Sequence, residues 1–478
     1  MKVPFLANNQ SPKEASIAAT SPPYEPKSVL ELRGSPSPVT ELEDHVLISP
    51  QLEEWDSLMR DLGLHDDPNP NPSPNLPDFP PATNAFDSSP FTATNFGLLP
   101  DIPNYTQNPN MVLDIGDWNP GFDYVDELIR LAECFETNSL QLGHVIAARL
   151  DQRLQSPSGK PLQRAAFYFK EALETLLTGS TRSPDLIQTI KAQKTFSTIS
   201  PIPMFSGFTA TQAVLDAVDG CTTAVHVVDF DIGLGGHWAP FIREMFEAEA
   251  RASPALRISA VVPEDYAAES TLVRENLTQF ARELNVIFEI DFVPIRNFEC
   301  MYFKSIKFVE GEKVAVVLSP AIFRRVGTGF LNDLSRVSPH VVVHVDGEGG
   351  TGFGAASYRQ AVIDGLEFYS TVLESLEAAA NFNGGGGGEW MRKIEAFVVY
   401  PKIVEGVEAA GRMGAAGWRE AMVAAGLRQV GLSQFAEFQA ECLLRRVQVR
   451  GFHVSKRQGE MMLCWHDRPL VATSAWRF

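Results

Sequence analysis

One segment of this chain constrains its fold more than any other. Residues 225–230 read Val-His-Val-Val-Asp-Phe, a mainly apolar run, and Gly233 and Gly235 follow closely. Apolar residues at helical spacing then begin at Trp238. A strand, a glycine-containing turn and a helix in this order are typical of a Rossmann-like sheet, in which the turn forms the ligand-binding edge. This segment therefore predicts an α/β fold.

The remainder of the second half repeats the alternation of strands and helices. Apolar runs that predict strands lie at residues 256–262, 286–293, 314–318 and 341–345. Strands that are apolar along their whole length, with helices between them, indicate a mainly parallel sheet covered on both faces. A hairpin formed by Met461–Trp465 and Val471–Trp476 is expected to close this sheet.

A helical region precedes the signature segment. Two stripes of apolar residues recur at helical spacing between residues 122 and 177, and Pro161 suits the first turn of the second stripe. We therefore expect a helical cap mainly over residues 121–200 and an α/β core over about residues 201–478.

The first 120 residues differ in composition from the rest. They contain 20 of the 33 prolines and carry 17 Asp and Glu against 5 Lys and Arg. Such composition predicts a disordered acidic, Pro-rich arm over residues 1–120. Within it, Leu52, Trp55, Leu58, Met59 and Leu62 have helical spacing among acidic residues. This segment is interpreted either as a peptide that folds on binding a partner or as a transient helix without one.

Charge and hydropathy limit the classes of partner. The net charge of the whole chain is −19, and about −7 of it falls after residue 120. Nucleic-acid binding through phosphates would therefore need a local basic groove. No apolar run approaches the roughly 20 residues of a membrane span, so no membrane partner is expected.

The glycine turn raises the alternative of an S-adenosylmethionine-dependent methyltransferase. A vestigial pocket of that kind would use the turn and a carboxylate after the next strand, namely Asp229, Asp231, Gly233, Gly235 and Glu264. No catalytic set follows on a later strand, and His237 and Trp238 place bulk where a cofactor would need close backbone approach. We therefore expect no catalytic residue, no cofactor and no metal. His226 is interpreted as a hydrogen-bonded core histidine or as a general base.

Two short motifs carry a resemblance to a known family. Val225, His226, Val227, Val228 and Asp229 resemble the Val-His-Ile-Ile-Asp signature of the plant GRAS family of transcriptional regulators. Ser474, Ala475 and Trp476 match the Ser-Ala-Trp ending of that family. The resemblance covers about residues 121–478. Within the family the chain is most similar to the hairy meristem subgroup of scarecrow-like proteins, and the segments that carry this likeness are residues 159–173, 229–236 and 451–458.

The resemblance implies a Rossmann-like, methyltransferase-related core with a helical cap. It also implies a nuclear coregulator without catalysis that acts through protein partners, among them WUSCHEL-type homeodomain factors, in shoot meristem maintenance. Homo- or heterodimers are compatible with this role. Some members bind DNA through a groove between cap and core, and direct sequence-specific DNA binding is a further alternative. Arg149, Arg153 and Arg164 are candidate contacts there, unless they form ordinary solvated helix faces.

Overall fold

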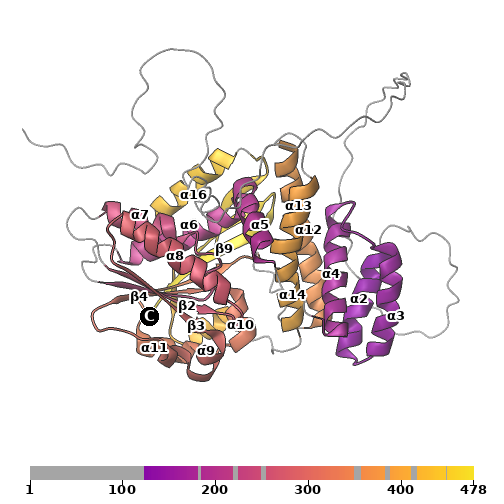
Figure 1. Ribbon diagram of the computed structural model, residues 1–478, viewed down its shortest axis with the longest axis horizontal. Coiled ribbons are helices and arrows are strands. Elements are labelled where there is room, and N and C mark those ends of the chain that lie inside the picture. The colour runs from indigo at the N-terminus through magenta and orange to yellow at the C-terminus, as the bar shows by residue number, and fades with distance from the viewer. Residues whose placement is uncertain are drawn as a thin grey trace, which may run out of the picture. The chain divides into compact units, whose positions relative to one another are not determined.

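A computed structural model describes residues 123–180, 185–218, 224–248, 255–348, 357–382, 388–410, 417–447 and 449–478 (Figure 1). The acidic arm predicted for residues 1–120 lies outside the described residues. Among those described, no helix is long and apolar enough to cross a bilayer.

The α/β core is built on one mixed sheet of nine strands among the described residues, in the order β3-β2-β1-β4-β5-β9-β8-β7, with β6 paired to β9. The first five strands in this order are parallel, and the pairs made by β6 to β9 are antiparallel. The expected parallel sheet and its closing C-terminal hairpin are thus confirmed. The strands are β1 (Val225–Asp229), β2 (Leu256–Val262), β3 (Phe288–Pro294), β4 (Lys313–Leu318), β5 (Val341–Asp346), β6 (Arg428–Val430), β7 (Phe452–Arg457), β8 (Glu460–Trp465) and β9 (Arg468–Arg477).

Helices cover both faces of the sheet because its central strands are apolar on both sides. On one face, Val225 and Val227 of β1 join a hydrophobic cluster with α6, α7 and α8. On the other face, Val228 joins a cluster with α9, α10, α11 and α15. These helices are α6 (Pro201–Val218), α7 (Trp238–Ala248), α8 (Ala267–Glu283), α9 (Ile295–Met301), α10 (Pro320–Val326), α11 (Leu331–Val337) and α15 (Trp418–Ala424).

The helical cap draws on two distant segments of the chain. Its first segment contains α2 (Asp123–Glu136), α3 (Leu140–Arg153), α4 (Pro161–Thr178) and α5 (Leu186–Ile199). Its second contains α12 (Tyr358–Phe382), α13 (Gly388–Ile394) and α14 (Tyr400–Ala409), which continues from a π-helical turn at Glu395–Val399. One hydrophobic cluster spans both segments, and α12 lies beside α2 and α4 (Figure 1). The cap therefore includes residues beyond the expected 121–200, because α12 packs on α2 and α4, α14 packs on α4, and α13 packs on α5.

The amino-terminal boundary of α4 follows the sequence closely. The helix begins at Pro161, as expected, and ends at Thr178, where it is capped by Gly179 with a φ of +65°. Proline lacks the amide proton that the first turn would leave unpaired, and glycine takes the left-handed conformation that ends a helix.

One further helix, α16 (Gln434–Val447), packs at the antiparallel end of the sheet. Ala436 and Ala440 on its inner face contact Met461, Leu463 and Val471 of the last two strands. The helix packs mainly on α6 and β7, and these small side chains allow close packing there.

Candidate functional site

The signature strand β1 lies in the middle of the sheet, between β2 and β4. Val225, His226, Val227, Val228 and Asp229 are each fully buried. A partner cannot touch these side chains in the folded protein. The strand can therefore influence a binding surface only indirectly, by positioning the residues that follow it.

His226 is the centre of a buried polar network. Its Nε2 lies 2.8 Å from Ser259 Oγ on β2, and its Nδ1 lies 3.1 Å from Arg257 Nη2. Arg257 in turn donates to both carboxylate oxygens of Glu312, at 3.0 and 2.5 Å. Burial, aided by the neighbouring Arg257 charge, lowers the pKa of His226 to about 4. The imidazole is therefore neutral at physiological pH.

Ser259, His226 and Glu312 are the residue types of a hydrolase triad. Their buried position, however, is unsuited to catalysis. Ser259 is 2% exposed, and the Phe308 ring lies 5.2 Å from that of His226. A substrate has no access to the hydroxyl. Of the two interpretations of His226, the structure places it as a hydrogen-bonded core histidine.

Asp229 ends the signature strand and holds the glycine turn together. Its Oδ1 accepts from the backbone N–H of Asp231 at 2.9 Å, and its Oδ2 accepts from Trp238 Nε1 at 2.8 Å. His237 Nε2 lies 3.4 Å from the same Oδ2. Both carboxylate oxygens are thus engaged by the protein itself, and the Trp238 ring is fully buried at the start of α7.

The turn glycines are constrained by the same packing. Gly235 has a φ of +71°, and a Cβ there would lie 3.0 Å from a Val273 methyl group on α8. Gly233 has a φ of +51° and open space around it. Glycine at 235 is therefore required for close packing of the turn on α8, a role that needs no cofactor.

Glu264, the carboxylate expected after β2, is already partnered. It accepts from the backbone N–H of Arg296 at 3.2 Å and lies 3.7 Å from Arg325 Nη2. Asp231 is exposed in the turn itself. The five residues of the vestigial pocket therefore share one edge of the sheet, but Asp229 and Glu264 serve intramolecular contacts there.

A second polar cluster at this edge joins the core to the cap. Arg324 of α10 donates to Glu348, which follows β5, at 2.8 Å and lies 3.5 Å from Glu405 of α14. Burial raises the pKa of Glu348 to about 7, although Arg324 opposes the shift. This cluster could not be read from the sequence, because Arg324, Glu348 and Glu405 come from distant segments.

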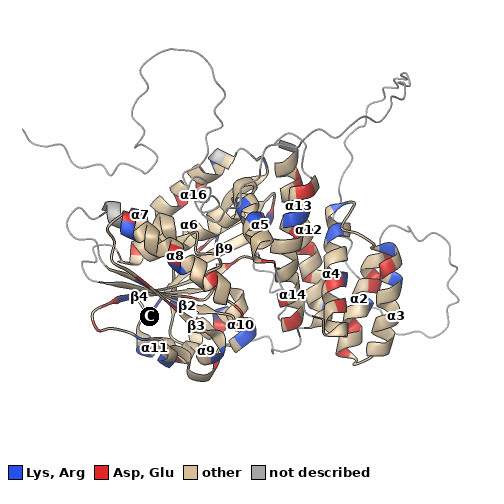
Figure 2. Cartoon of the chain, viewed as in Figure 1, with Lys and Arg blue, Asp and Glu red and all other residues tan. Residues whose placement is uncertain are grey.

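The three candidate DNA-contact arginines separate into two environments. Arg149 and Arg153 lie on α3 with half-exposed side chains, and each pairs with Glu127 of α2. Arg164 is buried in the cap, where it binds Glu395 at 2.9 Å and also Glu377. Figure 2 shows the mixed charges on the cap helices. Arg164 thus holds cap helices together, while the other two remain accessible.

The C-terminal motif lies on β9 inside the core. Ser474 is fully buried, and Trp476 is 1% exposed and donates from Nε1 to Ser474 Oγ at 3.0 Å. The Trp476 ring contacts the Trp418 ring edge to face, with 6.0 Å between centroids. The motif therefore lies buried within the sheet, on a strand that pairs with β5 and β8.

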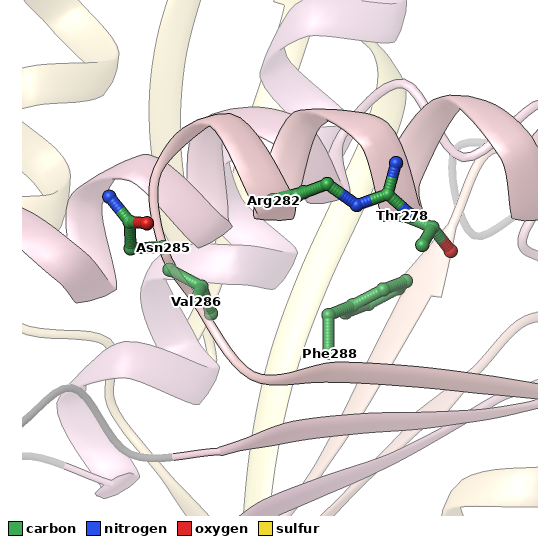
Figure 3. A pocket seen from close by; sticks show the side chains of 5 residues that line it. All are labelled: Thr278, Arg282, Asn285, Val286 and Phe288. Atoms are coloured by element: carbon green, nitrogen blue, oxygen red, sulfur yellow. The ribbon is translucent and has the colours of Figure 1, made fainter.

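One surface pocket lies away from these residues. Its volume is about 310 Å³, and Figure 3 shows the side chains that line it, Thr278, Arg282, Asn285, Val286 and Phe288. It sits where α8 ends and β3 begins. That is the amino edge of the parallel strands, whereas Rossmann-like folds bind ligands at the carboxyl edge.

Sequence reasoning missed an exposed aromatic pair on α16. Phe435 and Phe438 are 47% and 54% exposed. Their separation of three residues was a usable signal, since it places both on one side of a helix. Only the packing of α16 decided that this side faces solvent.

Comparisons with known proteins agree with this geometry. The model of the GRAS domain family matches residues 124–477. The chain is 47% identical to Scarecrow-like protein 15 of Arabidopsis thaliana, over 97% of this chain and 100% of that protein. It is 35% identical to Scarecrow-like protein 6 of the same species, over 78% of this chain and 68% of that protein. A solved structure, "Crystal Structure of SCL7 in Oryza sativa", matches with a TM-score of 0.56 and 23% identity, covering 74% of this chain and 99% of that chain. At that identity the structural match establishes the fold alone.

Proposed function

The chain belongs to the GRAS domain family, and from this premise we propose that it regulates transcription in the plant nucleus through protein partners. Regulators of this family are non-enzymatic, interact with other transcription factors and are typically nuclear. The observation that carries the proposal is the similarity to a scarecrow-like protein along nearly the whole chain.

The geometry of the sheet edge supports a scaffold rather than a cofactor site. Asp229 uses both carboxylate oxygens for Trp238 and the turn backbone, and Glu264 is held by the Arg296 backbone and Arg325. S-adenosylmethionine would have to displace these contacts to reach either carboxylate. Calorimetric titration of the full chain with S-adenosylmethionine is expected to give no heat of binding at micromolar concentrations. Saturable binding that Gly235→Trp abolishes would contradict this.

We also propose the finer role implied by the sequence motifs. In it the protein belongs to the hairy meristem subgroup, of which Scarecrow-like protein 6 is a member, and binds WUSCHEL-type homeodomain factors to maintain shoot meristems. The segments at residues 159–173, 229–236 and 451–458 support this assignment, because the signature and C-terminal motifs are common to the whole family.

The partner proposal is tested by recovery from plant nuclei. The full chain, expressed with an affinity tag in shoot apices, is expected to accumulate in nuclei and to co-purify with a homeodomain factor. Trp476→Ala, which should destabilise the domain, serves as the inactive control. Exclusion of the tagged chain from nuclei would contradict the proposal, and so would the absence of any transcription factor among the proteins that co-purify with it.

Direct DNA binding is a second candidate function, favoured by two accessible arginines one turn apart on α3. The side chains of Arg149 and Arg153 are 54% and 47% exposed. If they contact phosphates, the Arg149→Ala, Arg153→Ala variant should bind duplex DNA more weakly and with a salt slope smaller by about one unit per lost contact. Arg336→Ala, on α11 and 74% exposed, is the matched control. Equal salt slopes for both variants would remove α3 from any DNA interface.

A further inference from the structure

The outer face of α16 combines aromatic, thiol and basic side chains. Phe435 and Phe438 are about half exposed, and Cys442 is half-buried. The Arg445 side chain is 71% exposed and pairs with Glu441 of the same helix at 3.4 Å. At 100° per residue these four positions fall within one third of the helix circumference. We call this stripe the α16 surface. Exposed aromatic residues grouped on one helix face mark an interaction site more often than isolated ones do.

The neighbouring edge of the sheet adds positive charge to this surface. Strand β7 is the last strand of the sheet and contacts α16 through the ion pair between Lys456 and Glu437. Residues 445–457 contain five Lys and Arg and no Asp or Glu, in a chain whose net charge is −19. Arg450 and Arg457 are exposed, and neither has an ion-pair partner among the described residues. A ligand that is both apolar and acidic would complement this surface.

The chain itself contains a segment with that chemistry. Residues 51–62 present Leu52, Trp55, Leu58, Met59 and Leu62 at helical spacing. The same segment carries four Asp and Glu against one Arg. As a helix it would offer one apolar face and an acidic flank, which is the pattern of a helix that packs on an apolar groove or face.

We propose that residues 51–62 dock on the α16 surface of the same molecule. Sixty residues separate Leu62 from Asp123, where the described cap begins. An extended proline-rich chain advances about 3 Å per residue, so a linker of this length reaches any part of the folded domain. Tethering also supplies an effective concentration on the order of millimolar, so a weak contact suffices. The docked segment covers Phe435 and Phe438, and partners that bind the α16 surface must displace it.

Cysteine cross-linking in the full chain tests the docking. The substitution Met59→Cys places a new thiol on the apolar face of the segment, and a short bis-maleimide can join this thiol to Cys442. Cys300 is also exposed, on α9, and is the internal reference. After correction for the labelling rate of each thiol, the linkage of the new thiol to Cys442 is expected to exceed that to Cys300 by at least fivefold. Equal yields at both cysteines would overturn the proposal.

A matched pair of surface variants, each made in the Met59→Cys background, separates docking from general loss of structure. Phe435→Ser, Phe438→Ser should reduce the linkage between the new thiol and Cys442 at least fivefold. Leu142→Ser, Val145→Ser removes two comparably exposed side chains from α3, 54% and 57% exposed, and should leave that linkage unchanged. Melting temperatures of both variants should stay close to that of the parent. Equal effects of the two variants would contradict a specific site.

Charge reversal tests how far electrostatic attraction contributes to docking. It also tests whether a second copy of the chain or DNA binds the α16 surface instead. Arg450→Glu, Arg457→Glu should lower the linkage at low salt, and adding Glu53→Lys, Glu54→Lys should restore it. Linkage only between two molecules, increasing with concentration, would assign the surface to a second copy and overturn docking in cis. Unchanged linkage together with loss of duplex DNA binding in the Arg450→Glu, Arg457→Glu variant would assign the basic residues to nucleic acid and overturn the electrostatic part of the proposal.

Discussion

The substitution Asp229→Asn separates a structural role of the signature carboxylate from a ligand-binding role. The carboxylate accepts two hydrogen bonds, from Trp238 Nε1 and from the Asp231 backbone, and Asp229 is fully buried. Asparagine has one acceptor oxygen, so at least one buried donor loses its partner. An unsatisfied buried donor costs about 1–3 kcal/mol, and the remaining bond loses its charge assistance, about 1 kcal/mol. Together the destabilisation should be about 2–4 kcal/mol.

This free energy converts into a measurable thermal shift. At about 2.1 cal/mol/K per residue, a domain of roughly 350 residues has an unfolding entropy near 0.7 kcal/mol/K, so the melting temperature should fall by ~3–6 °C. Differential scanning calorimetry of the full chain measures it. Trp238→Phe removes the other end of one bond, and in a double-mutant cycle the two changes should be less than additive by about 1–2 kcal/mol. Full additivity, or an unchanged melting temperature in Asp229→Asn, would refute the structural role.

Three other predictions concern buried groups. Trp476→Ala should destabilise the domain by about 3–5 kcal/mol, and an unaltered melting curve would contradict it. Burial lowers the pKa of His344 to about 3, below its unfolded value of about 6.5, so the stability gained from its neutral form is complete above pH 6.5 and is lost as the pH falls. Between pH 7 and pH 5, the free energy of unfolding measured in urea should therefore fall by about 2 kcal/mol less for His344→Phe than for the parent. Equal decreases for the two proteins would refute this. Arg164→Ala leaves Glu395 buried without its cation and should cost about 3–5 kcal/mol in the same assay, against under about 1 kcal/mol for Arg149→Ala at the surface. Similar destabilisation by Arg164→Ala and Arg149→Ala would contradict the buried ion pair of Arg164.

Much of the core could be predicted because its signals are local. The apolar runs at 256–262 and 341–345 give strands with nearly the same bounds, since a central parallel strand must be apolar on both faces. Pro161 predicted the start of α4 for an equally local reason. Strand β7 was missed, because its half-exposed, basic sequence lacks both an apolar run and a clean alternation.

Long-range pairing accounts for what the sequence did not reveal. The partners of Arg164 come from α12 and from the turn before α14, more than 200 residues away, so nothing near it distinguished a buried arginine from a solvated one. The same applies to Arg324, whose ion pairs connect core and cap.

The signature strand and its glycine turn show where the two kinds of information divide. The sequence by itself determined that a buried strand meets a glycine turn and a helix, because hydrophobic periodicity and glycine spacing are properties of neighbouring residues. The tertiary structure alone decided how the edge is used, since hydrogen-bond partners depend on which side chains the fold brings together. In the folded protein the Trp238 indole donates to Asp229, Val273 packs against Gly235, and Phe435 and Phe438 face solvent.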